Sequence, residues 1–329
     1  MRYATPTLHL AATLVAITIA VGADSPTLGA RPADAWDWPI AIGVDSASEV
    51  YVGRLTDEGS GNVMRLTADG QPRGAWRTDG PMVDLAVGPD ASVYTVMNKS
   101  NRVYRFAQGG APNGMWQADG NVQAIAAGPL GPAIGGSVYV LWTPQRIGEP
   151  PSGPPRITRF DPRGAELAGW EVGPLAYDLT VTVTEAAPDG VVTVAEGGGT
   201  ISRFEPDGSV LGAWRTVAAE GRRIAAGPGG DAYLAFQPSP GEAAELWRYT
   251  QDGAGSLACT LPANPPRDVS VDPLSGDIYV LFPDSVLRLA PDCTVLGRIS
   301  HEQLIGAPPS GSARTLFVPY SAHGIETRF

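Results

Sequence analysis

Several polar residues stand at the same place in a repeated segment, where a short apolar stretch begins. Asp84 and Asp268 take this place in two copies, Asp178 lies near it in a less regular copy, and Arg223 and Gln303 take it in two others. Hard divalent cations prefer convergent carboxylate ligands, but a guanidinium among them would compete with the ion. The pattern leaves two interpretations open: a ligand or cation site, and a solvated acidic surface.

Histidine is the second residue type that indicates chemistry. His301 and His323 both fall in the last copy of the repeat, and Glu302 follows the first of them. Imidazole beside carboxylate can bind a metal or exchange protons near neutral pH. The spacing matches no metal-ligand motif, so a pair of surface histidines is the alternative.

Motifs for other chemistries do not occur in the sequence. We find no nucleophile elbow, phosphate-binding loop or zinc motif. We therefore expect no cofactor and no metal, with a divalent cation bound by the aspartates as the alternative. Whether the protein is an enzyme stays open at this stage, with the balance toward a protein that is not one.

The elements that must position these residues are short β-strands in a repeat of about 40 to 50 residues. Copies begin near residues 39, 83, 123, 180, 223, 267 and 303. Each copy has four apolar strands separated by turns such as Asp207-Gly208, a pair suited to tight hairpins. A four-stranded repeat of this length predicts a β-propeller. We expect an all-β fold of seven blades, with six blades as the alternative.

One arginine recurs between apolar residues in the third strand of every copy. The seven positions are Arg65, Arg105, Arg159, Arg203, Arg248, Arg288 and Arg328. Counting back from the turn places a small residue opposite most of them, as Gly212 lies opposite Arg203. The small residue leaves space beside the arginine. We therefore predict that the guanidinium lies toward the tryptophan two residues further along the fourth strand, a contact worth about 0.5–2 kcal/mol. A ring of anion-binding arginines is the alternative.

The two ends of the chain suggest how the ring closes. Residues 27–31, "TLGAR", match the fourth-strand segment "VLGAW" at 210–214, and the sequence ends after a third strand, "IETRF". We expect residues 27–31 to pair with 325–329 and complete the seventh blade, which would remove exposed strand edges.

The second copy, residues 81–110, carries the pattern by which the sequence resembles the NHL-repeat propellers: a strand, "VGPD", "VY" and then "NRVYRF". The resemblance implies the fold and brings no catalytic residue. More distantly, the sequence is similar to virginiamycin B lyase and regucalcin-like lactonase propellers. Their chemistry depends on a central metal, and their ligand sets have no residue-by-residue match here.

The beginning of the sequence and its charge predict location and partners. Residues 1–23 read as a signal peptide, and 24–329 as one propeller domain, exported to an extracellular, periplasmic or cell-surface location. No span of the membrane is expected after cleavage. The formal net charge of −11 argues against a nucleic-acid partner.

Cys259 and Cys293 are the two cysteines in the sequence. An exported protein with two cysteines favours a disulfide, and Cys293 stands at a turn position where other copies have glycine. Because the predicted register leaves their separation uncertain, pairing and two free thiols both remain open.

Taken together, the sequence favours a secreted propeller that acts as a binding or scaffold module for a protein, peptide or glycan. The alternative is a metal-dependent lyase or lactonase that acts at the mouth of the central channel. Convergence of Asp84, Asp268 and a third ligand on the axis would favour the enzyme.

Overall fold

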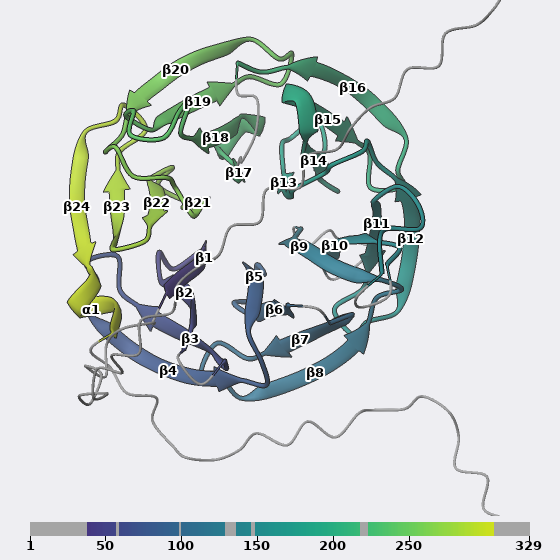
Figure 1. The fold of residues 1–329 in the computed structure, drawn as a ribbon, viewed down its shortest axis with the longest axis horizontal. Coiled ribbons are helices and arrows are strands. Elements are labelled where there is room, and N and C mark those ends of the chain that lie inside the picture. The colour runs from purple at the N-terminus through teal and green to yellow at the C-terminus, as the bar shows by residue number, and fades with distance from the viewer. Residues whose placement is uncertain are drawn as a thin grey trace, which may run out of the picture. The chain divides into compact units, whose positions relative to one another are not determined.

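The computed structural model describes residues 38–56, 59–98, 100–128, 136–145, 149–217 and 223–305. These residues form six antiparallel sheets of four strands each, and every sheet is one continuous section of chain. Figure 1 shows the sheets as blades around a common axis, with the first strand of each blade innermost and the fourth outermost. We number the blades 1 to 6 and the strands within a blade a to d.

The strands of blades 1 to 3 come in chain order. They are β1 (Trp38–Val44), β2 (Val50–Leu55), β3 (Gly61–Leu66), β4 (Pro72–Thr78), β5 (Met82–Val87), β6 (Val93–Met97), β7 (Arg102–Phe106), β8 (Pro112–Gln117), β9 (Asn121–Ala127), β10 (Val138–Thr143), β11 (Arg156–Phe160) and β12 (Glu166–Glu171).

Blades 4 to 6 follow the same order, with two single-turn 3-10 helices and one short α-helix added. The elements are β13 (Asp178–Thr182), β14 (Val191–Glu196), η1 (Gly197–Gly199), β15 (Thr200–Phe204), β16 (Val210–Arg215), β17 (Arg223–Ala226), η2 (Pro228–Gly230), β18 (Ala232–Phe236), β19 (Glu245–Tyr249), β20 (Gly255–Thr260), β21 (Asp268–Val271), β22 (Ile278–Phe282), β23 (Ser285–Leu289), β24 (Val295–Ser300) and α1 (His301–Ile305). No helix among the described residues has the length and apolar character to cross a membrane.

The prediction of seven blades is wrong, and the propeller has the six blades expected as the alternative. The ring closes between blades 6 and 1, where Ile42 N donates to Asp268 Oδ2 at 2.7 Å. Apolar residues of both blades, including Val52 and Leu281, form one buried cluster at this contact. The segment expected to begin a seventh blade at residue 303 forms α1 instead.

Ring closure therefore needs no strand exchanged between the chain ends, because blade 1 contains its own outer strand β4. The predicted pairing of 27–31 with 325–329 lies outside the described residues, as does Arg328.

The predicted pairs between the arginines and small residues are observed, but the two-residue turn that predicted them is wrong: three residues separate the paired Glu205 and Ser209, and a β-bulge follows Arg203. Strand c places Arg65, Arg105, Arg203 and Arg288 opposite glycines and Arg159 opposite Ala168. Five blades also place an aromatic residue of strand b on the other side of the arginine, as Tyr94 lies opposite Arg105.

The tryptophan contact predicted for these arginines occurs in blade 4, where Arg203 Cζ lies 6.0 Å from the Trp214 ring centre. In blades 2, 3 and 6 the guanidinium lies over the strand-b tyrosine at 5.8–5.9 Å. Blade 4 differs because Thr193 replaces that tyrosine. The arginine thus turns to the aromatic ring that its own blade offers.

The outer tryptophans instead pack against the following blade. Trp76 lies 5.9 Å from Phe106 of blade 2, and a Cβ built on Gly110, in the c–d turn of blade 2, would lie 2.6 Å from the indole. Trp116 and Trp170 repeat both contacts with blades 3 and 4. The strand-d tryptophan and the turn glycine of the next blade therefore form a repeated junction at the rim.

Candidate binding site on the propeller axis

Equivalent residues near the beginning of the six inner strands form a layer around the axis. Strand pairing places Ala41, Asp84, Ala124, Asp178, Arg223 and Asp268 at equivalent positions in blades 1 to 6. The aspartates therefore alternate around the ring, in blades 2, 4 and 6. All three are buried.

Each aspartate connects two blades through backbone amides. Asp84 Oδ1 accepts from Leu85 N of its own strand at 2.8 Å, and Asp84 Oδ2 accepts from Ile125 N of blade 3 at 2.9 Å. The same pair of bonds recurs at Asp178, with Leu179 and Ile224, and at Asp268, with Val269 and Ile42. Inner strands have one free edge, so these amides would otherwise lie buried without a partner. Three carboxylates thus satisfy one amide from each of six blades.

Arg223 lies close enough to interact with all three carboxylates. Burial would lower its pKa, but the charges of Asp178, Asp268 and Asp84 raise it overall, so the guanidinium stays charged. Burial raises the pKa of each aspartate, and the other carboxylates add to the effect at Asp84 and Asp268. The pKa of Asp268 reaches about 7. The layer therefore carries more carboxylate than its one cation can neutralise, and it takes up protons near neutral pH.

A cavity of about 450 Å³ lies on the axis, next to this layer. All six blades line it, from the aspartate layer to the a–b turns at Ser46, Pro89, Pro228 and Pro273. The three aspartates are the first residues of their strands that line it, so they form its inner end. The cavity thus extends toward the a–b turns, away from the face where the inner strands begin.

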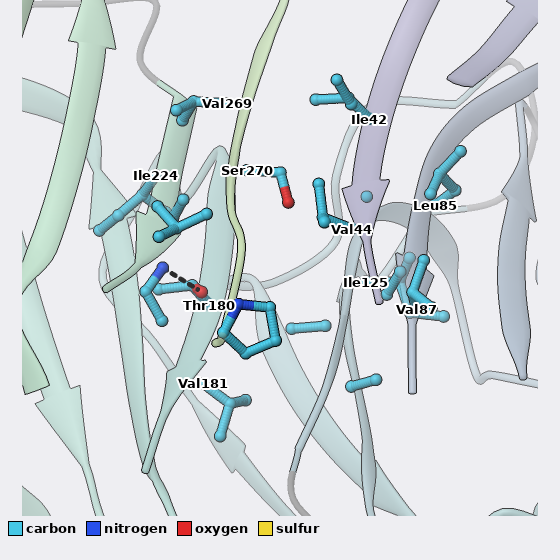
Figure 2. Close-up of a pocket in the computed structure, with 18 of the residues that line it drawn as sticks. Ile42, Val44, Leu85, Val87, Ile125, Thr180, Val181, Ile224, Val269 and Ser270 are labelled. Carbon is cyan, nitrogen blue, oxygen red and sulfur yellow. Dashed lines mark hydrogen bonds between the residues drawn. The ribbon is translucent and has the colours of Figure 1, made fainter. Parts of the chain in front are cut away.

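The walls of the cavity are mainly apolar. Figure 2 shows Ile42, Val44, Val87, Val181 and Val269 around the opening. Asp45 and Ser46 add polar groups at the a–b turn of blade 1, and the hydroxyls of Thr180 and Ser270 interrupt the walls. Thr180 Oγ1 accepts from Ala226 N at 2.9 Å, and the Ser270 side chain extends toward the space beside β1. The space exists because the wall two residues beyond the aspartate layer has small side chains, such as Gly43, Ala86 and Ser270.

A divalent cation does not fit this arrangement. Each aspartate already accepts two amide protons, and Arg223 supplies the positive charge among them. Among the described residues, no group of three or more histidine, cysteine, aspartate or glutamate side chains is placed to hold one ion. Asp84, Asp178 and Asp268 do converge on the axis, but their carboxylates accept backbone amides and interact with the guanidinium of Arg223.

The other predicted site residues lie elsewhere. Gln303, in α1, lies at the rim, where a Cβ on Gly70 would be 3.1 Å from its Nε2. His301 begins the same helix and lies half-buried, with no hydrogen-bond partner for Nδ1. His323 lies outside the described residues. The structure thus brings together Asp84, Asp178, Arg223 and Asp268 and places Gln303 and His301 away from them.

Sequence reasoning did not find Thr180, Ser270 or the face toward which the cavity extends. Small and hydroxyl residues two positions after the aspartates were the available signal. It is weak, because such residues are common in strands.

Comparison with known proteins supports the fold. No family model and no curated protein matches the sequence. Many solved structures resemble the chain. One is virginiamycin B lyase from Staphylococcus aureus, at 16% identity and a TM-score of 0.55, covering 80% of this chain and 84% of that chain. A second is a streptogramin B lyase, at 14% identity and a TM-score of 0.54, covering 79% and 82%.

Hydrazine synthase from Kuenenia stuttgartiensis is a third, at 14% identity and a TM-score of 0.57, covering 82% of this chain and 81% of that chain. At such identities the similarity concerns the fold alone. It agrees with the observed architecture: the protein is a β-propeller.

Proposed function

We propose that this protein is a binding module whose axial cavity takes a ligand with an apolar body and a positively charged amino group. The observation that carries the proposal is an apolar cavity of about 450 Å³ that ends at three buried carboxylates. This volume falls in the range of small-molecule pockets. A lysine side chain of a peptide combines both features, a short alkyl chain and an ammonium group.

Charge supports the cationic group. The layer holds three carboxylates and one guanidinium, and an ammonium at its cavity side would stabilise the ionised carboxylates. An anionic ligand at the same place would be repelled by the ionised carboxylates. Among protein, peptide and glycan partners, a peptide therefore fits best, because a glycan would leave many hydroxyls against apolar walls.

Export of the protein is part of the proposal. The leader-like residues 1–23 support it, as does the disulfide between Cys259 and Cys293, because such bonds persist in oxidising compartments. An exported binding module with an acidic cavity would encounter peptides outside the cytosol.

The test is calorimetry at pH 7 with three probes of equal length: hexylammonium, hexanol and hexanoate. We expect hexylammonium to bind at least about tenfold more tightly than hexanol, a difference of about 1.4 kcal/mol, and hexanoate not to bind. Ser270→Phe, which fills the cavity, should abolish binding. Ser239→Phe, in an exposed turn, is the matched control and should bind normally.

Equal affinity for the three probes, or binding that survives Ser270→Phe, would contradict the proposal. Titration with calcium, magnesium, zinc and manganese tests the lyase or lactonase alternative. A tight one-to-one divalent site that Asp84→Asn or Asp268→Asn removes would replace the binding module with that alternative.

A further inference from the structure

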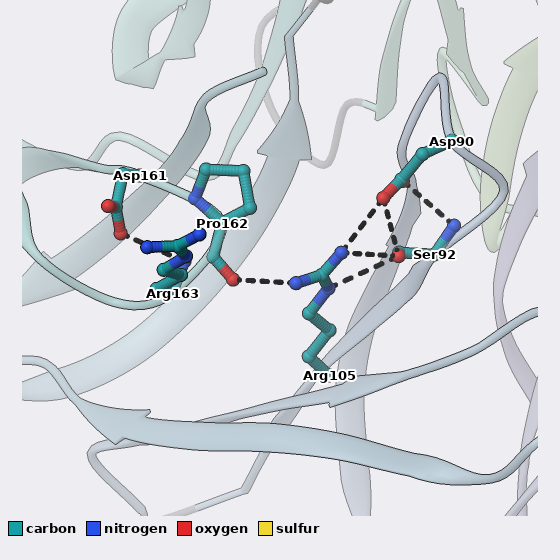
Figure 3. Close-up of polar contacts among 6 residues, drawn as sticks. All are labelled: Asp90, Ser92, Arg105, Asp161, Pro162 and Arg163. Atoms are coloured by element: carbon teal, nitrogen blue, oxygen red, sulfur yellow. Dashed lines mark hydrogen bonds and ion pairs between the residues drawn. The ribbon is translucent and has the colours of Figure 1, made fainter. Parts of the chain in front are cut away.

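Two kinds of hydrogen bond connect neighbouring blades, and they do not reach every junction. The aspartate bonds on the axis connect blades 2 and 3, 4 and 5, and 6 and 1. At the rim, the strand-c arginine often reaches the c–d turn of the next blade. Figure 3 shows one case, where Arg105 binds Asp90 and Ser92 of its own blade and donates to Pro162 O of blade 3 at 3.1 Å.

The same rim bond occurs at three other junctions. Arg159 donates to Pro206 O, Arg203 donates to Gln251 O and Arg288 pairs with Asp69. Between blades 1 and 2, Gln108 Nε2 donates to Asp45 Oδ2 at 3.3 Å.

Between the described residues of blades 5 and 6, neither kind of bond occurs. The axial position in blade 5 is Arg223, which has no acceptor to offer the blade 6 amides. The rim arginine, Arg248, pairs with Asp231 of its own blade, and within the described part of the chain it makes no bond to the c–d turn of blade 6. This junction also lacks the repeated tryptophan and glycine.

A disulfide stands in the place of that tryptophan and glycine. Cys259 lies opposite Leu246 in β19, as Trp214 lies opposite Ile201 in β15. Cys293 holds the turn position of Gly208 and has the same left-handed backbone, with φ of 70°. Residues with a Cβ rarely adopt this backbone conformation, so glycine is the usual residue at this position. The bond joins the two blades with a Cα–Cα distance of 5.9 Å.

The geometry points to a redox-sensitive junction: the Cys259–Cys293 disulfide holds blades 5 and 6 together, and its reduction loosens this junction selectively. A dithiol reductant supplies the two electrons. Its thiolate attacks one sulfur, which breaks the Cys259–Cys293 bond, releases one cysteine as a thiolate and leaves the other in a mixed disulfide with the reductant. The second thiol of the reductant then releases the other cysteine, the two cysteine thiolates take up protons, and the reductant becomes a disulfide. The shared apolar core of blades 5 and 6, which includes Ala235 and Val280, stays in place. Loosening is therefore local, and it does not depend on which ligand the cavity binds.

Amide hydrogen exchange with and without dithiothreitol tests this inference. After reduction, exchange in β20 and in the turn before β24 should rise by about tenfold or more, while β8 and β12 at other junctions should keep their rates. Cys259→Ser with Cys293→Gly should show the raised rates without reductant. Cys259→Trp with Cys293→Gly introduces the tryptophan and glycine of the four junctions from blade 1 to blade 5, and it should show low rates that dithiothreitol does not change.

Unchanged exchange in β20 after confirmed reduction would overturn the inference, and so would an equal rise at all six junctions. If the tryptophan variant does not fold, the serine variant and the reduced native protein still decide the question.

Discussion

The rim and the axis of this propeller are built on different rules. At the rim, most blades repeat the same residues: an arginine in strand c, a small residue opposite it, and a tryptophan that packs on the turn of the next blade. On the axis, the equivalent residues change from blade to blade, in the order alanine, aspartate, alanine, aspartate, arginine and aspartate.

This difference separates stability from candidate function. A contact that most blades repeat stabilises the ring and carries no information about a ligand. The axial layer is unequal around the ring, and it faces a cavity. Its aspartates serve both purposes, because each one binds two amides and also contributes charge to the end of the cavity. Substitutions in each region should show how far the two differ.

Loss of an axial aspartate should have the largest effect. Asp84→Ala leaves two buried amides without an acceptor, and each such loss costs about 1–3 kcal/mol. We expect the free energy of unfolding to fall by about 2–6 kcal/mol in chemical denaturation. Asp207→Ala removes an aspartate that accepts one amide in an exposed turn, and it should change stability little. Equal effects of the two changes would remove the distinction between axis and rim.

The pH dependence of stability should also originate on the axis. The pKa of Asp268 is about 7 in the folded protein, above its ordinary value of 3.8. The folded state therefore holds a proton that the unfolded state has lost, and the stabilisation present below pH 4 is lost as pH rises through 7. We expect the free energy of unfolding to fall by about 1 kcal/mol or more between pH 5 and pH 8.

Asp268→Asn should flatten this slope, and Asp207→Asn should leave it unchanged. Stability that does not fall over the same interval in the native protein would show that the axial carboxyls bind no extra proton in the folded state, which contradicts a raised pKa in this layer.

The sequence predicted the repeated features well and the unrepeated ones poorly. The pair Arg203–Gly212 was predicted from a two-residue turn, whereas the observed turn has three residues between Glu205 and Ser209. A β-bulge between Arg203 and Phe204 shifts the register by one residue, so the predicted pair is nevertheless correct. The number of blades did not follow, because residues 303–305 resemble the start of another copy. Whether β21 packs against β1 depends on contacts between segments more than 200 residues apart, such as Ile42 with Asp268.

The axial residues were identified, but their roles were not. Asp84, Asp178, Arg223 and Asp268 were predicted to share one end of the channel, since equivalent strand positions lie at one level. The bonds from each carboxylate to the next blade could not be foreseen, because they require the offset between neighbouring blades. The position of the cavity on the far side of this layer could not be predicted for the same reason.

The smallest effect concerns the arginines of the rim. Arg203 lies over Trp214, whereas Arg105 lies over Tyr94. A double-mutant cycle between Arg203→Ala and Trp214→Ala should give a coupling of about 0.5–1 kcal/mol. The matched cycle between Arg105→Ala and Trp116→Ala should give almost none. Similar coupling in both blades would mean that the tyrosine does not decide where the guanidinium lies.

The most direct test of the proposed site is the number of protons released when the cavity binds an ammonium ion. Calorimetry of hexylammonium binding at pH 7, repeated in phosphate and imidazole buffers, measures this number from the change in heat with the ionisation enthalpy of the buffer. An ammonium next to the aspartate layer lowers the pKa of carboxyls that titrate near 7, so binding should release a fraction of a proton, and Asp268→Asn should reduce it. A heat of binding that is the same in both buffers would show that the ligand does not meet the carboxylates and would contradict the proposed site.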